Sequence, residues 1–418
     1  MANILLISIF GDAYAVATKF AEEGHDVKVY IKDPRAKRTG QGCKNPLTVD
    51  SWSPCVAKAD MVLFDMVKMG KLADRIKASG KLVIGGSDFA DTGELDRDIG
   101  QEMMKATGAI IPKSKTFNTV KECIKYIEKQ DYPCVFKPIG NEYTAWTFVS
   151  EEDNAGLLSF LKSIKKDVPA LIQQRVDGTE ISTEGMFNGK VFTNFNHTIE
   201  KKRFMDGDVG PNTGCAGNVV WPCSRDKLVE TLLIPLESTL RKAKYNGPVD
   251  VNSIVNKDGA NFLELTIRFG YDAIQSLLSL TDKKYEYLLS SCCYRSNNEQ
   301  KLRQEYSVAV RLSMPPYPHS DKGVEQLEGL EVIEAPGYLK KHLWLSDVMA
   351  DEEGEPVMAG VDGVVGCATA TADTVDKAIG SAYTVVNAVK INRDLQYRQD
   401  IGRGVQESIE TLEENGWL

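Results

Sequence analysis

The segment NFLELTIRFG, residues 261–270, combines residue types that could hold a metal ion beside a phosphate. If it forms a strand, Glu264 and Thr266 lie on one face, and Arg268 follows on that face two residues further on. Mg2+ takes oxygen ligands and commonly bridges nucleotide phosphates. A carboxylate beside an arginine could therefore bind the metal and the transferring phosphoryl group. The alternative is a surface strand with an ion pair.

A second strand pattern with oxygen ligands lies just upstream, in GPVDVNSIV. It presents Asp250 and Asn252 on one face, and the turn sequence NKDG follows it. This turn predicts a hairpin that brings Asp250 or Asn252 near Glu264. Ligands from two adjacent strands favour a Mg-ATP site over the alternative, which is the polar outer face of a hairpin.

Two further segments carry groups suited to a nucleotide. Lys137 ends the apolar pattern DYPCVFKP, and a lysine on a buried strand is costly unless it meets an anion. The alternative is a strand-end lysine that extends to solvent. In IQQRVDGTEIS, backbone groups of Gln174, Arg175 and Val176 could pair with an adenine edge. Glu180 could accept hydrogen bonds from ribose hydroxyl groups.

The segment KKRFMDGDVGPNTGCAGN, residues 201–218, suits an anionic ligand. It opens with Lys201, Lys202 and Arg203 and continues with glycine, asparagine and threonine. A loop of this composition exposes backbone N–H groups that can hold a carboxylate or an acyl phosphate. The density of residues with special backbone conformations disfavours the alternative, a flexible surface loop.

The elements that must position these groups change character along the chain. Over roughly the first 90 residues, buried strand patterns such as NILLISIF alternate with helical patterns such as AYAVATKFAEEG, which predicts a doubly wound parallel sheet. Beyond them, paired strand patterns around Asp-Gly and Asn-Gly turns indicate α+β structure with antiparallel hairpins. We therefore expect a multidomain α/β and α+β protein. The expected bounds are 1–100 for the N-terminal domain, 101–185 and 186–303 for two central α+β subdomains, and 304–418 for a small C-terminal α+β domain.

Composition argues against several other classes. The 418 residues carry a formal net charge of -9, which disfavours a broad nucleic-acid-binding face. The cysteines show no paired metal spacing and histidines are few, which disfavours a zinc site. The N-terminus lacks a secretion signal, and no apolar run approaches the roughly 18 residues of a membrane span. We expect a cytoplasmic protein without a membrane or nucleic-acid partner, as a monomer or homodimer.

Taken in order, these segments resemble the phosphoribosylamine–glycine ligase (glycinamide ribonucleotide synthetase) family of purine synthesis, within the ATP-grasp superfamily. The resemblance covers nearly the whole chain. The matching stretches are GSDFADTGELDRDIGQEMM, FKPIGN, VDGTE, DVGPNTG, LELTIRFG, GVVGCATATADTVDKAIGSAY and YRQDIGRG. This family activates a carboxylate by attack on the γ-phosphate of ATP, and an amine then displaces phosphate from the acyl phosphate. The resemblance implies a C–N ligase that uses ATP and Mg2+ or Mn2+ and takes an amino acid and an amine as substrates.

The resemblance also implies roles for individual residues. ATP would be held by Arg97, Lys137, Gln174, Arg175, Val176 and Glu180. The metal would be held by Glu264, with Asp250, Asn252 and Thr266 as candidates for further ligands. Lys137 and Arg268 would take part in catalysis, Lys137 by holding the ATP phosphates and Arg268 by steadying the transferring phosphoryl group. The amino-acid substrate would be held by Asp208, Pro211, Asn212, Thr213 and Gly214, and the amine by the first loop, at Gly11 and Asp12.

Several positions depart from the family pattern. The family's first loop is rich in glycine and has an Arg-Glu-His run that helps to bind the ribosyl phosphate, whereas this chain reads SIFGDAYAVA with only Gly11. Asp12 would repel a phosphate there, or it could cap the following helix. The loop after Lys137 is shortened to GNEYTAW, Thr266 replaces the metal asparagine, and Gly-Cys-Ala-Gly replaces Gly-Gly-Met-Gly. The leading hypothesis is ligation of glycine to phosphoribosylamine. The alternatives are ligation to a different amine and a nucleotide-binding protein that has lost turnover.

Overall fold

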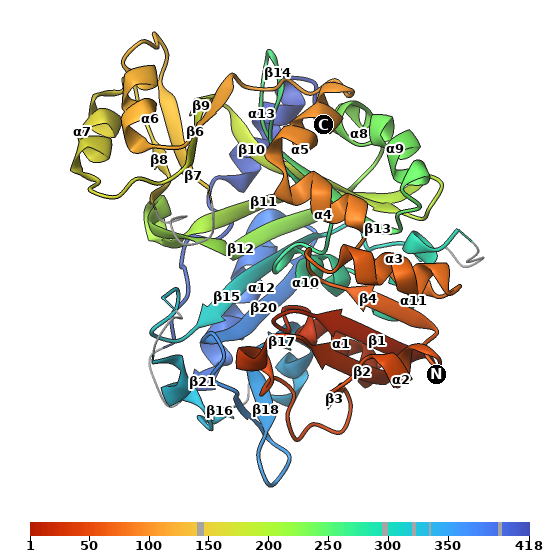
Figure 1. Ribbon diagram of the computed structural model, residues 1–418. Coiled ribbons are helices and arrows are strands. Elements are labelled where there is room, and N and C mark those ends of the chain that lie inside the picture. The colour runs from red at the N-terminus through yellow and green to blue at the C-terminus, as the bar shows by residue number, and fades with distance from the viewer. Residues whose placement is uncertain (140–145, 295–299, 320–322, 334–335, 392–394) are drawn as a thin grey trace.

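Five parallel strands form the N-terminal sheet of the computed structural model, which describes residues 1–139, 146–294, 300–319, 323–333, 336–391 and 395–418 (Figure 1). In spatial order these strands are β3 (Leu47–Val49), β2 (Asp26–Ile31), β1 (Asn3–Ser8), β4 (Met61–Phe64) and β5 (Leu82–Ile84). Residues 4–7 of β1 are apolar and buried on both faces, as expected inside a parallel sheet. Helices α1 (Tyr14–Glu22), α2 (Ser53–Val56) and α3 (Gly70–Ala78) connect the strands. The predicted N-terminal parallel sheet is confirmed.

This sheet has a topological switch point at the carboxyl end of β1. Because β1 lies between β2 and β4, the connections on its two sides run in opposite directions and leave a crevice where ligands commonly bind. Ile7 in β1 pairs with Phe64 in β4, so the segments that follow the two strands lie side by side. Those segments carry Asp12 and Asp65.

A four-stranded antiparallel sheet forms a separate layer, drawn at the upper left of Figure 1. Its strands, in spatial order, are β6 (Ser114–Phe117), β9 (Ala170–Gln174), β7 (Cys134–Pro138) and β8 (Phe148–Val149). Helices α6 (Val120–Ile127) and α7 (Ala155–Ser163) pack against it around Phe136, Leu157 and Leu161. This small core is separate from the main one, and the opposite face of the sheet, which carries Val135, Lys137 and Gln173, lines a cavity.

The third sheet has eight antiparallel strands and runs through the middle of the molecule. In spatial order they are β14 (Gly259–Thr266), β13 (Gly247–Asn256), β10 (Thr179–Phe187), β11 (Phe192–Met205), β12 (Val209–Cys223), β15 (Tyr306–Ser313), β20 (Val364–Ala372) and β17 (Leu343–Leu345). The predicted hairpin is present, because β13 pairs with β14 through the turn after Asn256. The side chain of Asn256 accepts hydrogen bonds from the N–H groups of Asp258 and Gly259 at 3.0 and 3.2 Å, which fixes that turn.

The remaining elements cover the sheets. The helices are α4 (Asp88–Leu95), α5 (Arg97–Lys105), α8 (Lys227–Leu232), α9 (Glu237–Lys242), α10 (Ala273–Ser279), α11 (Lys284–Cys292), α12 (Val375–Ala388) and α13 (Val405–Glu414). Short 3₁₀ helices are η1 (Pro34–Ala36), η3 (Asp206–Asp208), η4 (Ile234–Leu236), η5 (Val324–Leu327) and η6 (Gly337–His342). Two small two-stranded sheets pair β16 (Val332–Ile333) with β21 (Lys390–Ile391) and β18 (Val348–Ala350) with β19 (Pro356–Met358). Within the described ranges, every helix is too short or too polar to cross a membrane.

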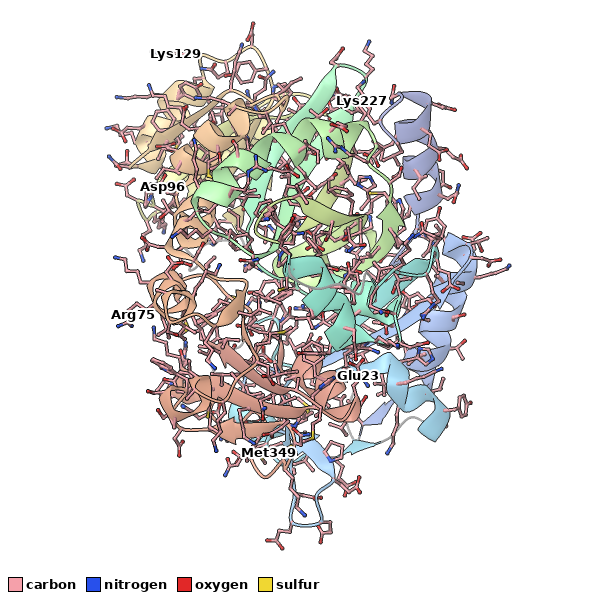
Figure 2. The ribbon with its side chains drawn as sticks, turned by 90° about the vertical axis from the view of Figure 1, so that its right-hand side faces the viewer. Glu23, Arg75, Asp96, Lys129, Lys227 and Met349 are labelled. Carbon is pink, nitrogen blue, oxygen red and sulfur yellow. The ribbon has the colours of Figure 1, made fainter. Side chains whose placement is uncertain are left out.

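The N-terminal sheet and the eight-stranded sheet share one continuous apolar core, which includes Ile4 and Ile84 from the first and Val251 and Leu265 from the second. Glu23, labelled in Figure 2, also joins these parts. Its carboxylate accepts hydrogen bonds from the N–H groups of Lys284 and Tyr285 at 2.8 and 3.1 Å, at the first turn of α11. The crevice beside β1 is therefore held against the large sheet.

The sheets cross two of the expected domain bounds. Strand β10 runs through residue 185, and β15, β17 and β20 extend the same sheet beyond residue 304. Backbone pairing between β12 and β15, such as Val219 with Val308, joins the two sides of that position. The domain bounds therefore stay predictions, whereas the multidomain α/β and α+β fold class is confirmed.

Candidate active site

A cavity of about 680 Å3 lies between the four-stranded sheet and the eight-stranded sheet, and we call it the nucleotide cavity. All of the predicted ATP-binding residues line it, together with the predicted metal ligand: Arg97, Lys137, Gln174, Arg175, Val176, Glu180 and Glu264. These residues come from both sheets, from helix α5 and from the connection between β9 and β10. The fold thus gathers groups that are far apart in the sequence, as the ATP-binding prediction requires.

The phosphate-binding candidates Lys137 and Arg97 reach the cavity from separate elements. Lys137 lies on β7 between buried neighbours, so its ammonium leaves an apolar strand directly into the cavity. Arg97 is the first residue of α5, whose cap Asp96 accepts hydrogen bonds from the N–H groups of Asp98 and Ile99. Burial and the nearby positive charge of Arg97 lower the pKa of Lys137 to about 8. Two cations held this close favour a polyanionic ligand between them. Of the shortened loop GNEYTAW after this strand, residues 140–145 lie outside the described residues.

The structure refines the predicted adenine contact. The N–H of Gln174 donates to the carbonyl of Lys113 at 2.8 Å, and the N–H of Arg175 donates to the carbonyl of Pro133 at 2.9 Å. Those two N–H groups are already used, so they are not available to an adenine edge, although both residues line the cavity. The guanidinium of Arg175 pairs with Asp177 at 2.6 Å.

Lys202 lies at the centre of the acidic wall of the nucleotide cavity. Its ammonium lies 2.9 Å from Glu264, 3.2 Å from Glu180 and 3.2 Å from Glu200. Burial alone would lower the pKa of Lys202, but the three carboxylates raise it well above its usual value. The positive charge of Lys202 in turn lowers the pKa of Glu264 to about 2. Glu264 is therefore ionised at neutral pH, as a metal ligand must be.

Asn252 completes the oxygen set next to Glu264. The two residues face each other across β13 and β14, and the amide of Asn252 donates to Glu180 at 3.0 Å and to Glu264 at 3.5 Å. The amide oxygen of Asn252 is buried and has no hydrogen-bond partner among the described residues. An ionised carboxylate and an unpaired amide oxygen on paired strands fit a hard cation such as Mg2+ or Mn2+.

The predicted metal candidates Asp250 and Thr266 lie elsewhere. They are opposite each other on β13 and β14 and line a second, smaller cavity of about 80 Å3, which we call the junction cavity. Burial, and then the charge of Glu184, raise the pKa of Asp250 well above its usual range. A carboxyl group that holds its proton is a poor metal ligand, so the structure favours Asn252 over Asp250 as a partner for Glu264.

Glu184 is a residue of this site that the sequence analysis missed. It pairs directly with Asp250 across β10 and β13, lines the junction cavity, and is 6% exposed. Burial raises its pKa to about 8. The signal was present, because Glu180, Ser182 and Glu184 alternate along β10 and therefore share one face.

Arg268 also lines the junction cavity, where it is held by a glutamate from the N-terminal part of the chain. Its Nε donates to Glu94 on α4 at 2.8 Å, and its guanidinium lies 4.8 Å from the ring centre of Tyr271. This pairing fixes the guanidinium beside the cavity that Glu264 also lines. Arg268 thus brings a guanidinium to the wall of the cavity that Glu264 and Lys202 also line.

The segment predicted as an anion-binding loop is instead mostly strand, which corrects that expectation. Residues 201–205 belong to β11 and residues 209–218 to β12, and the pairs Arg203 with Asn212 and Met205 with Val209 close the hairpin around η3. Backbone pairing therefore takes up many of the N–H groups that the loop would have exposed. Gly207, at φ 71°, supplies the left-handed conformation that this tight connection needs.

The predicted amino-acid-binding residues on this hairpin are divided between cavities. Asp208 and Asn212 line the nucleotide cavity, whereas Gly214 lines the junction cavity. Asp208 accepts from Lys201 at 2.7 Å and from the buried Arg398 at 2.8 Å. The hydroxyl of Thr213 donates to the carbonyl of Lys202 at 2.9 Å, which ties β12 to β11, and Pro211 lies between these residues in β12.

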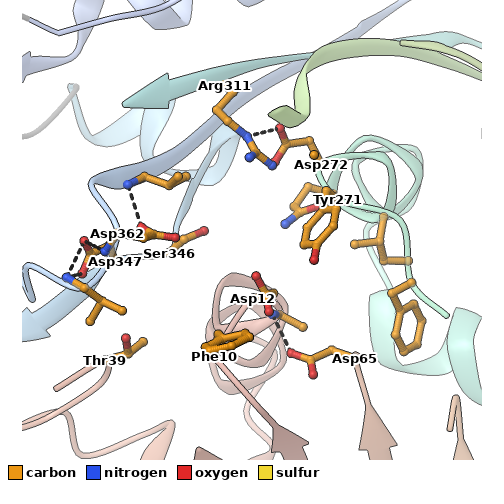
Figure 3. A pocket seen from close by; sticks show the side chains of 18 of the residues that line it. Phe10, Asp12, Thr39, Asp65, Tyr271, Asp272, Arg311, Ser346, Asp347 and Asp362 are labelled. Carbon is orange, nitrogen blue, oxygen red and sulfur yellow. Dashed lines mark hydrogen bonds and ion pairs between the residues drawn. The ribbon is translucent and has the colours of Figure 1, made fainter. Parts of the chain in front are cut away.

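Gly11 and Asp12 line a third cavity, of about 240 Å3, at the carboxyl end of β1 (Figure 3). We call it the acidic cavity. The expectation that Asp12 could cap the next helix is not met, because the cap of α1 is Ala13 and its N–H donates to Asp65 at 3.0 Å. The side chain of Asp12 is free to face the cavity instead. Gly11 adopts φ 88°, which lets the chain turn away from β1.

Comparisons with known proteins agree with this arrangement. Residues 96–273 match the family described as "Phosphoribosylglycinamide synthetase, ATP-grasp (A) domain". The chain is 22% identical to the phosphoribosylamine–glycine ligase of Clostridium acetobutylicum, over 96% of this chain and 99% of that protein. It is 26% identical to the phosphoribosylamine–glycine ligase of Streptococcus pneumoniae, again over 96% and 99%.

Solved structures show the same fold. The phosphoribosylamine–glycine ligase of Thermotoga maritima aligns with a TM-score of 0.69 at 20% identity, over 96% of this chain and 100% of that one. A biotin carboxylase of Campylobacter jejuni aligns with a TM-score of 0.61 at 13% identity, over 100% and 97%. The fold and the nucleotide cavity thus define an ATP-grasp enzyme, a ligase that forms a C–N bond. Within the chain, residues 96–273 match the ATP-grasp domain of phosphoribosylglycinamide synthetases, and the chain is similar over 96% of its length to phosphoribosylamine–glycine ligases.

Proposed function

We propose that this chain activates the carboxylate of glycine with ATP and joins it to an amine. One observation carries the proposal: three cavities adjoin in the order that this reaction needs. Glu200, Lys202 and Glu264 line both the nucleotide and the junction cavity. Gly214, Gly270 and Tyr271 line both the junction and the acidic cavity. A carboxylate in the junction cavity would have ATP on one side and the amine on the other.

In the nucleotide cavity, Lys137 and Arg97 would bind the phosphates and Glu180 the ribose. Glu264 and the amide oxygen of Asn252 would hold Mg2+ or Mn2+, which supplies charge neutralisation at the phosphate oxygens when bound. Lys202 would keep Glu264 ionised, and the guanidinium of Arg268 would steady the phosphoryl group. These residues position and neutralise charge, which is most of what phosphoryl transfer asks of a protein.

In the junction cavity, the size of the space selects the acid. At about 80 Å3 this cavity is the smallest of the three, which favours a small amino acid such as glycine. Asp250 and Glu184 would accept the ammonium group of glycine, which restores charge to two acids that burial keeps protonated. The carboxylate would then point toward Arg268 and Glu264.

The amine has two candidates. Phosphoribosylamine is the first, because the relatives that align over the full chain are named for it. An amine of different charge is the second, and it is favoured by Asp12 and Asp65 in the acidic cavity. The nine free cysteines support a cytoplasmic location, and we expect a monomer or homodimer there.

Hydroxylamine trapping tests the proposed function without assuming the amine. When the enzyme is incubated with glycine, Mg-ATP and hydroxylamine, we expect ADP release and formation of glycine hydroxamate, because hydroxylamine reacts with the acyl phosphate. Alanine should give a smaller yield and valine none, since the junction cavity is small. Absence of glycine hydroxamate, at an enzyme concentration that would detect a single turnover, would contradict the proposal.

A further inference from the structure

The acidic cavity is built from three parts of the chain that meet at the end of the N-terminal sheet (Figure 3). Phe10, Asp12 and Asp65 come from the ends of β1 and β4, and Tyr271 comes from the segment before α10. The third wall follows β17 and precedes β20, and it includes Asp347. Because this cavity adjoins the junction cavity at Tyr271, it is the place from which an amine would approach the acyl phosphate.

The lining of this cavity is strongly acidic. Its carboxylates are those of Asp12, Asp65, Asp272, Asp347 and Asp362. Among its described lining residues the sole cationic side chain is Arg311, and that guanidinium pairs with Asp272 at 2.8 Å. Arg268, which lies nearby, is paired with Glu94 at 2.8 Å. The neighbouring cations are thus already neutralised by other carboxylates.

Backbone N–H groups stabilise two of the other carboxylates of this cavity, those of Asp347 and Asp362. Asp347 accepts from the N–H groups of Val361, Asp362 and Gly363 at 2.9 to 3.1 Å, so it organises its own loop. The side chain of Asp362 accepts from the N–H of Val364 at 2.8 Å. These two carboxylates have a structural role at the far wall.

Asp12 and Asp65 are different, because each keeps an oxygen without a partner. One oxygen of Asp65 accepts from the N–H of Ala13, while the other is buried and has no hydrogen-bond partner among the described residues. Asp65 is 3% exposed, so water does not replace that partner freely. One buried oxygen of Asp12 is likewise unpartnered within the described part of the chain. Figure 3 shows the two side chains close together at the floor of the cavity.

Asp65 is buried and Asp12 is partly buried, and two adjacent acids that each hold a buried oxygen without a partner are unfavourable unless a cation binds there. Burial, and then the charge of Asp65, raise the pKa of Asp12 to about 7, and burial raises the pKa of Asp65 to about 6. A positively charged ligand would reverse both shifts and satisfy the free oxygens.

We propose that the acceptor amine carries a second positively charged group and no phosphate, and that Asp12 and Asp65 bind this charge. The inference rests on the proposed ligase function and names the class of its amine. A phosphate would bring about two negative charges at pH 7 beside an acidic pair whose neighbouring arginines, Arg268 and Arg311, already pair with other carboxylates. The reacting nitrogen of the acceptor is its other, uncharged amine, and it would form the C–N bond to the acyl carbon. The C–O bond to phosphate breaks, the phosphate takes the electron pair, and the amine proton ends on the phosphate.

Three amines with the same two-carbon skeleton test the charge directly. Ethylenediamine, ethanolamine and O-phosphoethanolamine carry a cation, a neutral hydroxyl and a phosphate opposite the reacting nitrogen. With glycine and Mg-ATP, kcat/KM measured by ADP release and product mass should fall in that order. We expect ethylenediamine to exceed O-phosphoethanolamine by about 100-fold or more, since charge pairs at this depth are worth a few kcal/mol. Equal rates, the reverse order, or faster turnover of freshly made phosphoribosylamine than of ethylenediamine would overturn the inference.

Variants of the acid pair locate the effect. Asp12→Asn should raise KM for ethylenediamine by about tenfold, because one carboxylate is lost. The ratio of kcat/KM for ethylenediamine to kcat/KM for O-phosphoethanolamine should fall as well. Asp50→Asn, at an exposed surface position, is the matched control and should change neither value. Asp65→Asn gives a second test if the first variant does not fold, and the wild-type ranking stands without either. An unchanged KM in a folded Asp12→Asn or Asp65→Asn variant would overturn the inference.

Hydroxylamine trapping separates the two proposals. If wild-type enzyme forms glycine hydroxamate but prefers the phosphorylated amines, the ligase function holds and the inference about the acceptor is wrong. If no hydroxamate forms, the ligase function itself fails, and the inference fails with it.

Discussion

The ammonium of Lys202 lies 2.9 Å from the carboxylate of Glu264, at the position where the strands of the large sheet face the nucleotide cavity. The same ammonium contacts Glu180 and Glu200, so one cation serves three carboxylates. Before a metal binds, this cation balances the charge of the acidic wall. We therefore expect Lys202 and the metal to share the carboxylates, which gives the first two predictions.

Glu264→Gln should lower kcat for glycine-dependent ADP release by about 100-fold or more, because an amide cannot neutralise metal charge as a carboxylate does. The fold should survive, since the side chain faces the cavity. Steady-state kinetics over a range of Mg2+ concentration and a thermal melt check both statements. Glu352→Gln, on an exposed turn, is the matched control. Near-normal turnover in Glu264→Gln would assign the metal to other residues.

Lys202→Met should lower the melting temperature in the absence of metal, because three neighbouring carboxylates lose their shared cation. Added Mg2+ should then raise the melting temperature of the variant by more than it raises that of the wild type. Differential scanning fluorimetry with and without Mg2+ measures the difference. Equal responses to Mg2+ would show that the lysine and the metal do not share these ligands.

How far the sequence predicts this site can be seen at Glu264 and Lys202. The pairing of Glu264 with Asn252 was predictable, because a short turn and strand alternation are local signals. Lys202 lies on β11, which is separated from the β13–β14 hairpin by β10. The residues around Lys202 in the sequence do not predict this strand order. The composition of the segment that begins at Lys201 therefore predicts a loop, whereas Lys201, Lys202 and Arg203 lie on strand β11, where successive side chains point to opposite faces.

Contacts between distant segments set a similar limit elsewhere. The hydrogen bond from Arg268 to Glu94 joins residues 174 positions apart. Asp12 and Asp65, whose buried oxygens have no partner in the part of the chain that the structure describes, meet only because two parallel strands pair. Composition and local spacing do not predict such contacts between distant residues. The parallel sheet and the hairpins could be predicted, whereas the partner of each charged group could not.

Glu184 should make the protein less stable as the pH rises. Burial raises its pKa in the folded chain to about 8, against 4.5 when unperturbed, so the folded state binds more protons between those values. The free energy of unfolding should therefore fall with rising pH across that window, by at most about 1.4 kcal/mol per pH unit for this group. Urea unfolding at pH 5, 6.5 and 8 of wild type and Glu184→Gln measures the effect. The variant should show a shallower decline, and parallel curves would show that Glu184 is not the group responsible.

Arg398 should matter for both stability and glycine binding, because it anchors the turn between β11 and β12. Its side chain is fully buried, donates to both oxygens of Asp400 at 2.7 Å, and reaches Asp208 at 2.8 Å and the carbonyl of Arg203 at 2.8 Å. Arg398→Met removes the buried cation and leaves Asp400 unpaired, which should cost about 3–5 kcal/mol of unfolding free energy.

The hairpin that Arg398 holds carries Asn212 and Gly214 to two of the cavities. In Arg398→Met, KM for glycine should therefore rise more than KM for ATP, measured below the melting temperature of the variant. Arg403→Met, an exposed arginine of the same segment, is the matched control and should leave both constants and the stability near wild type. A second variant, Arg398→Met with Asp400→Asn, removes the unpaired charge. It should recover stability without recovering glycine affinity, because the contacts to Asp208 and to the turn stay lost. Recovery of both together would show that Arg398 acts on glycine binding only through global stability.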